Sequence, residues 1–350
     1  MNTTPLRLVI LWSVGACVGT LVVAVTSPWF VRSYLPLQAD TVRGVWTLPS
    51  DSVYRWRSEG YADSRIGPYG MPGKRDVDPD FGDSTPTQRV ALWGDSQAEG
   101  VCLRDSDKLF SQLEQESSGR LDVFPLARSG EDAAVWLTQM HAVEQALGIE
   151  RHVMLVAELS DLLAATQAPV PAPREADAAA ANGAIAARLP AFIIQGARHL
   201  LREEDGSTPR RLRFGIGPVG SLAVANGSNV EPATSAPASR WRAPLAAIRA
   251  ASQRPITLVY APRVPHIIDG QVRWEDPDDD DFHAVRSIAN ELELVVVDAR
   301  AAMRQSAAAG KWPHGFHNGQ IGVGHLNRIG NAVLAEQLAE SVKPKRDSRN

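Results

Sequence analysis

Short apolar runs with the length of β-strands alternate with amphipathic helical patterns from residue 88 onward, and this alternation constrains the fold more than any other feature. It is typical of βαβ units, in which helices cover both faces of a parallel sheet. The sequence therefore predicts a flavodoxin-like, three-layer α/β/α domain over 88–343 with a mostly parallel five-stranded sheet. The predicted strands are 89–93, 121–125, 152–157, 256–260 and 293–297, and the predicted helices lie near 97–117, 131–147, 240–252, 279–291, 299–309 and 328–341.

One interval, at about 165–239, interrupts the alternation. It opens with alternating Ala and Pro, continues with an alanine-rich run, and ends in a stretch rich in Gly, Ser and Asn. Long loops of this kind within compact domains are often lids or binding loops. We expect an insertion that forms a partly ordered cap beside the functional site.

An uncharged apolar stretch, 8–25, lies near the start of the sequence, with Arg7 before it and Trp29 and Arg32 after it. Its length suffices to cross the hydrocarbon core of a bilayer, and tryptophan favours the interface. A cleaved signal peptide is the alternative, but its apolar core is ordinarily shorter and ends in small residues. We therefore expect residues 1–32 to form an uncleaved, single-pass transmembrane anchor in the inner (cytoplasmic) membrane, with the large domain on the periplasmic side.

Residues 33–87 are predicted to form a linker and a loop-rich segment. Aromatic residues and glycines are dense between 54 and 73, and Gly and Pro interrupt every helical pattern there. A hairpin that lies beside the functional face of the sheet is the structure that we expect from this segment.

The overall charge excludes nucleic acid as a partner. Lys and Arg number 36 against 40 Asp and Glu, a net charge of −4, and no basic stripe follows any predicted element. The acidic run 275–281 matches no standard calcium loop. His314, His317 and His325 lack the Cys or carboxylate pattern of a zinc site, so we expect neither a metal nor another cofactor.

Two short motifs lie where an α/β sheet brings side chains together. The strand 89–93 runs directly into Gly94-Asp95-Ser96, and His325 lies just before the last predicted helix. Open α/β sheets bind ligands at the carboxyl ends of their strands. A serine hydroxyl is a weak nucleophile at neutral pH, and a positioned imidazole is the usual base that activates it. A turn with an N-cap serine would give the same triplet, so the pairing with His325 carries the prediction of a nucleophilic serine.

These motifs resemble those of the SGNH, or GDSL, hydrolases, whose four sequence blocks can be followed over roughly 88–342. Gly94-Asp95-Ser96 matches the first block and His325, within Gly-His-Leu-Asn, matches the fourth. Gly130, in Leu-Ala-Arg-Ser-Gly, matches the second, and Ser160-Asp161 stands at the third. The resemblance implies a serine hydrolase in which Ser96 is the nucleophile, His325 is the base, and the backbone N–H of Gly130 stabilises the oxyanion.

The chain departs from the family pattern at two places. The third block ordinarily has Asn before Asp, and Ser160 stands there, so its hydroxyl becomes a candidate oxyanion donor unless it is the N-cap of a following helix. The fourth block ordinarily has an aspartate three residues before the histidine, and Gly322 stands there. We therefore predict a Ser–His dyad in which a backbone carbonyl of 318–324 orients His325, with Asp298 as the alternative orienting acid.

The resemblance and the anchor together predict a membrane-anchored esterase that removes O-acyl groups, such as acetyl, from an extracytoplasmic carbohydrate or polymer. Its partner would be a small-molecule or polysaccharide ester. Acyl transfer to a polysaccharide hydroxyl would pass through the same acyl-enzyme. A catalytically degenerate scaffold in envelope polysaccharide assembly is a third hypothesis, because a decayed site would lose the Asn and Asp that are absent here. Nothing in the sequence defines an oligomeric state.

Overall fold

A five-stranded parallel sheet forms the centre of the computed structural model, which describes residues 5–30, 32–33, 35–74, 87–168, 238–268 and 270–342. The strand order is β11-β8-β7-β5-β6, and every neighbouring pair is parallel. Counted along the chain this is the 2-1-3-4-5 order of flavodoxin-like sheets, so the predicted fold class is confirmed. The strands are β5 (Gln88–Trp93), β6 (Leu121–Pro125), β7 (Arg151–Val156), β8 (Ile256–Tyr260) and β11 (Val295–Asp298).

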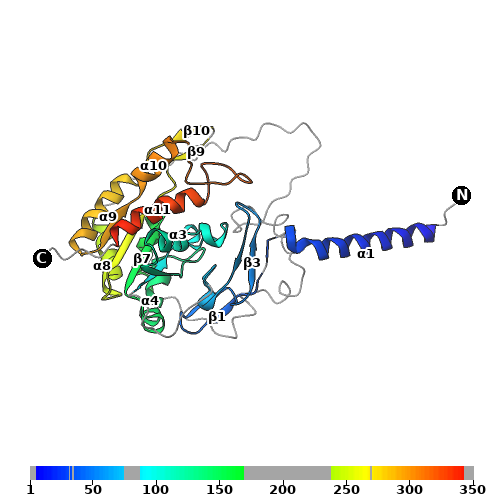
Figure 1. Cartoon of the computed structure of the whole chain (residues 1–350), viewed down its shortest axis with the longest axis horizontal. Helices are drawn as coiled ribbons and strands as arrows, with labels where there is room; N and C mark the ends of the chain where they lie inside the picture. Colours follow the sequence, from blue (N-terminus) through cyan, green and yellow to red (C-terminus); the bar gives the residue numbers. More distant parts are fainter. Residues whose placement is uncertain are drawn as a thin grey trace.

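Helices cover both faces of this sheet and close two apolar cores (Figure 1). Trp136, Leu245 and Phe282 come from three helices of one layer and are almost fully buried. The other core contains Leu113 and Leu334. The first layer comprises α4 (Ala133–Leu147), α8 (Arg242–Ala250) and α9 (Asp279–Glu291), and the second comprises α3 (Leu109–Glu116), α10 (Arg300–Ala308) and α11 (Arg328–Ser341).

The predicted helix 97–117 is not continuous, and this prediction was wrong. The chain forms α2 (Ser96–Glu99), leaves it at Gly100 in the left-handed conformation, and passes through the short 3-10 turn η2 (Asp105–Asp107) before α3 begins. A glycine in the left-handed conformation is a common helix terminator. Ser96 is consequently the first residue of a single helical turn that follows β5.

The long apolar helix α1 (Pro5–Phe30) projects away from the α/β domain in Figure 1. Its segment Leu6–Ser27 has a mean hydropathy of 2.4, and its large apolar side chains, such as Leu11, Trp12 and Leu21, are exposed. By length and composition this helix can cross a membrane. Its carboxyl-terminal end contacts the domain, because the Trp29 carbonyl accepts a hydrogen bond of 3.1 Å from the Tyr61 hydroxyl.

The segment that precedes β5 folds into two small antiparallel pairs, without a helix longer than one turn in its described part, 35–74. They are β1 (Gln38–Asp40) with β2 (Val45–Thr47), and β3 (Val53–Trp56) with β4 (Ala62–Arg65), followed by the turn η1 (Pro68–Gly70). Tyr54 of the second pair and Ile66, just after β4, pack on Val101 in the loop after α2. The hairpin expected beside the functional face of the sheet is therefore present.

A third small hairpin and three short helices complete the described elements. The hairpin β9 (His266–Ile268) and β10 (Gln271–Arg273) follows β8. The helices are α5 (Ser160–Leu163), η3 (Ala164–Thr166) and η6 (Ala238–Trp241). The insertion predicted at 165–239 lies outside the described residues except at its two ends, and the domain boundaries at 33 and 88 stay predictions.

Candidate active site

Ser96 is positioned by a tight turn at the carboxyl end of β5. Gly94 has φ +153°, and a Cβ there would lie 2.7 Å from the Ala98 Cβ and 3.0 Å from the Leu155 carbonyl oxygen. Only glycine fits between α2 and β7 at this point. Asp95 then caps α2, because its carboxylate accepts a 2.8 Å hydrogen bond from the Gln97 N–H. The Gly-Asp-Ser triplet thus serves as a turn, a cap and a half-buried helix start.

The structure brings His325 to Ser96, although 229 residues separate them in the sequence. The His325 Nε2 lies 3.0 Å from the Ser96 Oγ. Two neighbours fix the loop that carries the histidine: the Leu326 N–H donates to the Gln97 side chain at 2.8 Å, and Asn327 caps α11 through the Ile329 N–H at 2.8 Å. A loop held at both α2 and α11 keeps the imidazole at the carboxyl ends of the strands.

The second ring nitrogen of His325 contacts Glu59, a residue that the sequence analysis did not identify. The Glu59 Oε2 lies 2.8 Å from the His325 Nδ1, and its Oε1 accepts the His325 backbone N–H at 2.7 Å. Glu59 lies in the loop between β3 and β4. Neither the backbone carbonyl nor the Asp298 that the sequence analysis predicted therefore occupies the position that orients the histidine.

A glycine next to His325 makes room for this carboxylate. A Cβ at Gly324, which has φ +91°, would lie 2.0 Å from the Glu59 Oε1, so a side chain there would displace the acid. At Gly322, the position of the family's aspartate, a Cβ would lie 2.7 Å from the Ile267 Cγ1, and φ is +78°. An aspartate at 322 is thus incompatible with the observed backbone, which agrees with an acid supplied from elsewhere.

The loop that carries Glu59 is tightly held. The Trp56 indole N–H donates to the Glu59 carbonyl at 2.6 Å, and Asn318 bonds to both the N–H and the carbonyl of Gly60 at 2.9 Å. Burial alone would raise the pKa of the Glu59 carboxyl. The hydrogen bonds from the His325 ring and backbone outweigh that effect and hold this pKa below its ordinary value. Glu59 is therefore a carboxylate at neutral pH.

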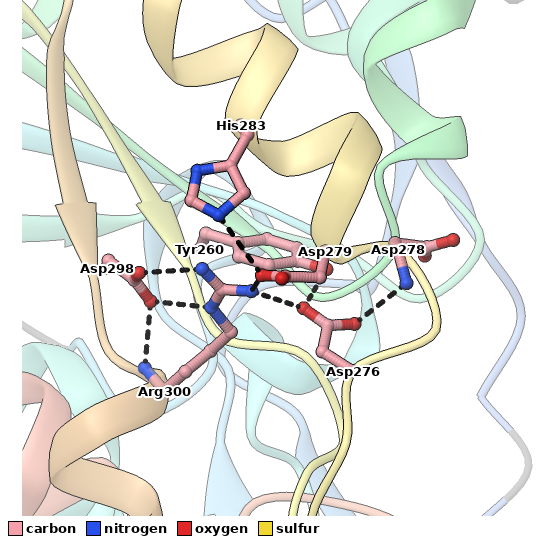
Figure 2. A network of polar contacts seen from close by, with 7 residues as sticks. All are labelled: Tyr260, Asp276, Asp278, Asp279, His283, Asp298 and Arg300. Carbon is pink, nitrogen blue, oxygen red and sulfur yellow. Dashed lines mark hydrogen bonds and ion pairs between the residues drawn. The ribbon is translucent and has the colours of Figure 1, made fainter. Parts of the chain in front are cut away.

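Asp298 belongs to a separate network at the end of β11 (Figure 2). Its two carboxylate oxygens each accept a 2.9 Å hydrogen bond from Arg300, which also binds Asp276 at 2.9 Å and contacts Asp279. The Asp276 carboxylate in turn accepts the Tyr260 hydroxyl at 3.0 Å. Burial would raise the pKa of Asp298, but the Arg300 bonds lower it instead. The prediction of Asp298 as an orienting acid fails because Arg300 occupies both of its oxygens.

Gly130 lies in the loop after β6, and this loop runs beside the Ser96 turn. The Arg128 N–H donates to the Gly94 carbonyl at 3.1 Å. Glu99, on α2, accepts both the N–H and the hydroxyl of Ser129, at 3.0 and 2.6 Å. Within the described residues no hydrogen-bond acceptor contacts the N–H of Gly130, which has φ +79°. That N–H remains available to a ligand.

Ser160 is exposed at the start of α5, and in the described part of the chain its hydroxyl makes no hydrogen bond. Leu159 rather than Ser160 occupies the N-cap position, so the alternative of a capping serine is not met. The neighbouring Asp161 carries an unusual carboxyl group. Burial, together with the nearby carboxylates of Asp95 and Glu158, raises its pKa to about 7.

No family model matches the chain, and no curated protein sequence matches it. Solved structures similar to it include an α/β hydrolase from the metagenome of Lake Arreo, Spain, at 12% identity, 74% coverage of this chain, 96% of that chain and a TM-score of 0.38. A G-D-S-L family protein from Desulfitobacterium hafniense matches at 11% identity, 73% and 99% coverage and a TM-score of 0.36. A carbohydrate acetylesterase family member from Sinorhizobium meliloti matches at 13% identity, 73% and 97% coverage and a TM-score of 0.34. Similarities of this size concern the fold, so the functional argument rests on the site residues.

Proposed function

We propose that this protein is a serine esterase of the SGNH type with a Ser96–His325–Glu59 triad. One observation carries the proposal: the Ser96 Oγ lies 3.0 Å from the His325 Nε2, and the His325 Nδ1 lies 2.8 Å from the Glu59 Oε2. Nucleophile, base and orienting acid in this sequence of contacts define a serine hydrolase site on any fold. The dyad expected from the sequence is thereby extended to a triad.

The geometry supports a two-stage reaction. Glu59 holds the ring proton of His325 on Nδ1, so Nε2 is free to accept the Ser96 proton as the Oγ attacks the ester carbonyl. The N–H groups of Ser96 and Gly130, with the Ser160 hydroxyl as a third donor, stabilise the resulting oxyanion. The protonated Nε2 then donates its proton to the departing alcohol, which leaves an acyl group on Ser96. In the second stage His325 Nε2 removes a proton from water as the water oxygen attacks the acyl carbon. The protonated Nε2 then returns this proton to the Ser96 Oγ as the acyl–oxygen bond breaks, which releases the carboxylic acid and restores the serine hydroxyl.

Two arguments support a substrate outside the cytoplasm. The helix α1 is long and apolar enough to cross a membrane, which supports the proposal of an anchor in the inner membrane. An anchor whose amino-terminal end faces the cytoplasm would place the α/β domain on the periplasmic side. The substrate would then be an O-acyl group, such as acetyl, on an extracytoplasmic carbohydrate or polymer. A protein that lacks residues 1–31 should be soluble and keep its esterase activity, whereas loss of folding would show that α1 is part of the domain.

Acyl transfer to a polysaccharide hydroxyl is the second candidate function, because a sugar hydroxyl can replace water in the second stage. Measuring acetate release with and without a sugar acceptor separates the two reactions. The Glu59 contact weighs against a degenerate scaffold, since the acid that the sequence motif lacks is supplied by the β3–β4 loop.

A fluorophosphonate probe tests the proposed function directly, because it reacts covalently with activated serines. We expect labelling of the wild-type protein, and none of Ser96→Ala. Ser129→Ala is a matched control, since this serine lies near the site but contacts Glu99 instead of His325. Absence of labelling in the folded wild-type protein would refute the esterase and favour the scaffold.

A further inference from the structure

A pocket of about 610 Å³ lies beside the catalytic histidine. Its walls come from the residues after β7 and β8, from β9, and from the loop that leads to His325. They include Glu158, Arg263, Ile267, His314 and Val323. The volume is within the range of small-molecule sites, about 300–1,000 Å³. The pocket is therefore large enough to hold a substrate portion beyond the scissile ester bond.

His314, in the wall of this pocket, is the side chain that points to a ligand. It is 1% exposed, and within the described residues neither of its ring nitrogens has a hydrogen-bond partner. Buried polar groups of this kind are nearly always paired, because an unpaired one costs stability. Its backbone is fixed, since the His314 carbonyl accepts the Gly322 N–H at 3.0 Å and His314 bridges to Leu326, next to His325.

The imidazole of His314 is neutral. Burial lowers its pKa to about 4, and the positive charge of Arg263 adds to this effect. The Glu59 carboxylate opposes the lowering, and His266 and His325 contribute to it slightly. A neutral imidazole offers one N–H donor and one acceptor nitrogen. A hydroxyl group, which can both donate and accept, can pair with either nitrogen.

The remaining lining favours a neutral, hydroxyl-rich ligand. Ile267 and Val323 provide aliphatic surface for the C–H face of a sugar ring, and the Gln320 amide provides a further donor and acceptor. Glu158 and Asp278 are carboxylates that accept hydrogen bonds from hydroxyls, while the Arg263 guanidinium is paired with Glu158 at 2.6 Å. This excess of acidic side chains disfavours an anionic ligand.

We propose that this pocket binds a neutral saccharide, the alcohol portion of the ester, and that His314 determines specificity through hydrogen bonding to its hydroxyls. The proposal rests on the proposed esterase function, and it places the sugar on the side of His325 formed by β8, β9 and the 314–324 loop. His314 takes no part in the chemical steps. It selects which esters are presented to Ser96.

Kinetics on two esters test this assignment. His314→Phe removes both nitrogens and fills part of the pocket, and His314→Gln keeps one donor and one acceptor. The matched control is His317→Gln, an exposed residue of the same loop. We expect His314→Phe to lower kcat/KM for acetylated xylotriose by about ten- to hundredfold, mainly through KM, because its hydroxyls lose their partners. Hydrolysis of p-nitrophenyl acetate, whose leaving group has no sugar, should change by less than about threefold, and His314→Gln should recover part of the loss.

Direct binding separates failure of this proposal from failure of the esterase function. In the full-length Ser96→Ala protein in detergent, calorimetry should detect xylotriose or maltotriose, and should detect trigalacturonate weakly or not at all. His314→Phe should abolish this binding. If the wild-type protein hydrolyses neither ester, the esterase function is wrong, while the calorimetry still decides whether the pocket binds sugar. Three outcomes would overturn the proposal. They are a lack of binding to either neutral trisaccharide, a preference for the anionic one, and an equal loss of activity on both esters in His314→Phe.

Discussion

Glu59→Gln is the substitution that best separates a triad from a dyad. The carboxylate accepts two hydrogen bonds, from the His325 Nδ1 side at 2.8 Å and from the His325 backbone N–H at 2.7 Å. A glutamine can satisfy only one of them, because one end of its amide is a donor. If the NH2 group faces Nδ1, the ring proton moves to Nε2, which can then no longer accept the Ser96 proton. If the NH2 group faces the backbone, it meets the His325 N–H, which is also a donor, and the loop that carries His325 must shift.

The size of the effect follows from these contacts. Exchange of the acid for its amide in a serine protease triad lowers turnover by about 10⁴-fold through the wrong tautomer. We expect Glu59→Gln to lower kcat/KM for p-nitrophenyl acetate by about 10³–10⁴-fold. Loss of one buried, charge-assisted hydrogen bond should also reduce the free energy of unfolding by about 1.5–3 kcal/mol. Asp298→Asn is the matched control and should change activity by less than about tenfold, because Asp298 contacts Arg300 instead of His325.

The pH dependence of stability provides a second test. The folded-state pKa of Glu59 is lower than its ordinary value of 4.5, so its carboxylate stabilises the fold above that pH, and this stabilisation is lost as the pH falls through the folded-state pKa. The difference in unfolding free energy between wild type and Glu59→Gln should therefore be full near pH 7 and shrink below about pH 4.5. Circular dichroism should show native structure for each variant. A folded Glu59→Gln protein with near-wild-type activity would refute the triad, and a 10⁴-fold loss in Asp298→Asn would restore the acid predicted from the sequence.

Four further substitutions test the rest of the site. Ser96→Ala and His325→Ala should each abolish ester hydrolysis, and the double variant should be barely slower than either one; multiplied losses would mean that the two side chains act separately. Asp161→Asn should raise the free energy of unfolding by about 1–2 kcal/mol at pH 8 and leave it unchanged near pH 4. The reason is that the folded protein keeps the Asp161 proton up to about pH 7, while the unfolded chain releases it near 3.8. A difference in chemical denaturation that does not depend on pH would contradict this pKa. Glu99→Ala removes the acceptor for both Ser129 groups and should lower kcat by about tenfold with little change in KM; a loss confined to KM would show that the loop acts in binding.

Local patterns were sufficient to predict the sheet. Each strand is a short run of apolar residues between turn signals, and the predicted strand 256–260 coincides with β8. The error in the predicted helix 97–117 has a local cause as well, since Gly100 and the Asp105–Asp107 turn interrupt a helical periodicity that continues on both sides. Ser96 and His325 were predictable from their places along the chain. One directly follows a predicted strand and the other directly precedes the last predicted helix, and an α/β sheet brings such positions together at the carboxyl ends of its strands.

Glu59 was not predictable in the same way. Its partner lies 266 residues further along the chain, and no spacing rule connects a hairpin that precedes the first sheet strand with a loop before the last helix. The available signals were the hairpin expected near the functional face and the single glutamate within 54–61. The glycine at 322 was the clearest sign that the acid comes from elsewhere, because the backbone there excludes a side chain.

The placement of Glu59 has a consequence for biosynthesis. Ribosomes make the acid first, then Ser96, and His325 only after most of the α/β domain. A nascent chain that has already exposed Ser96 therefore lacks its general base until the loop before α11 emerges and docks on Gln97. If the proposed function is correct, no ester can be hydrolysed before the loop that precedes α11 has been made, and a chain that ends before residue 325 would be inert.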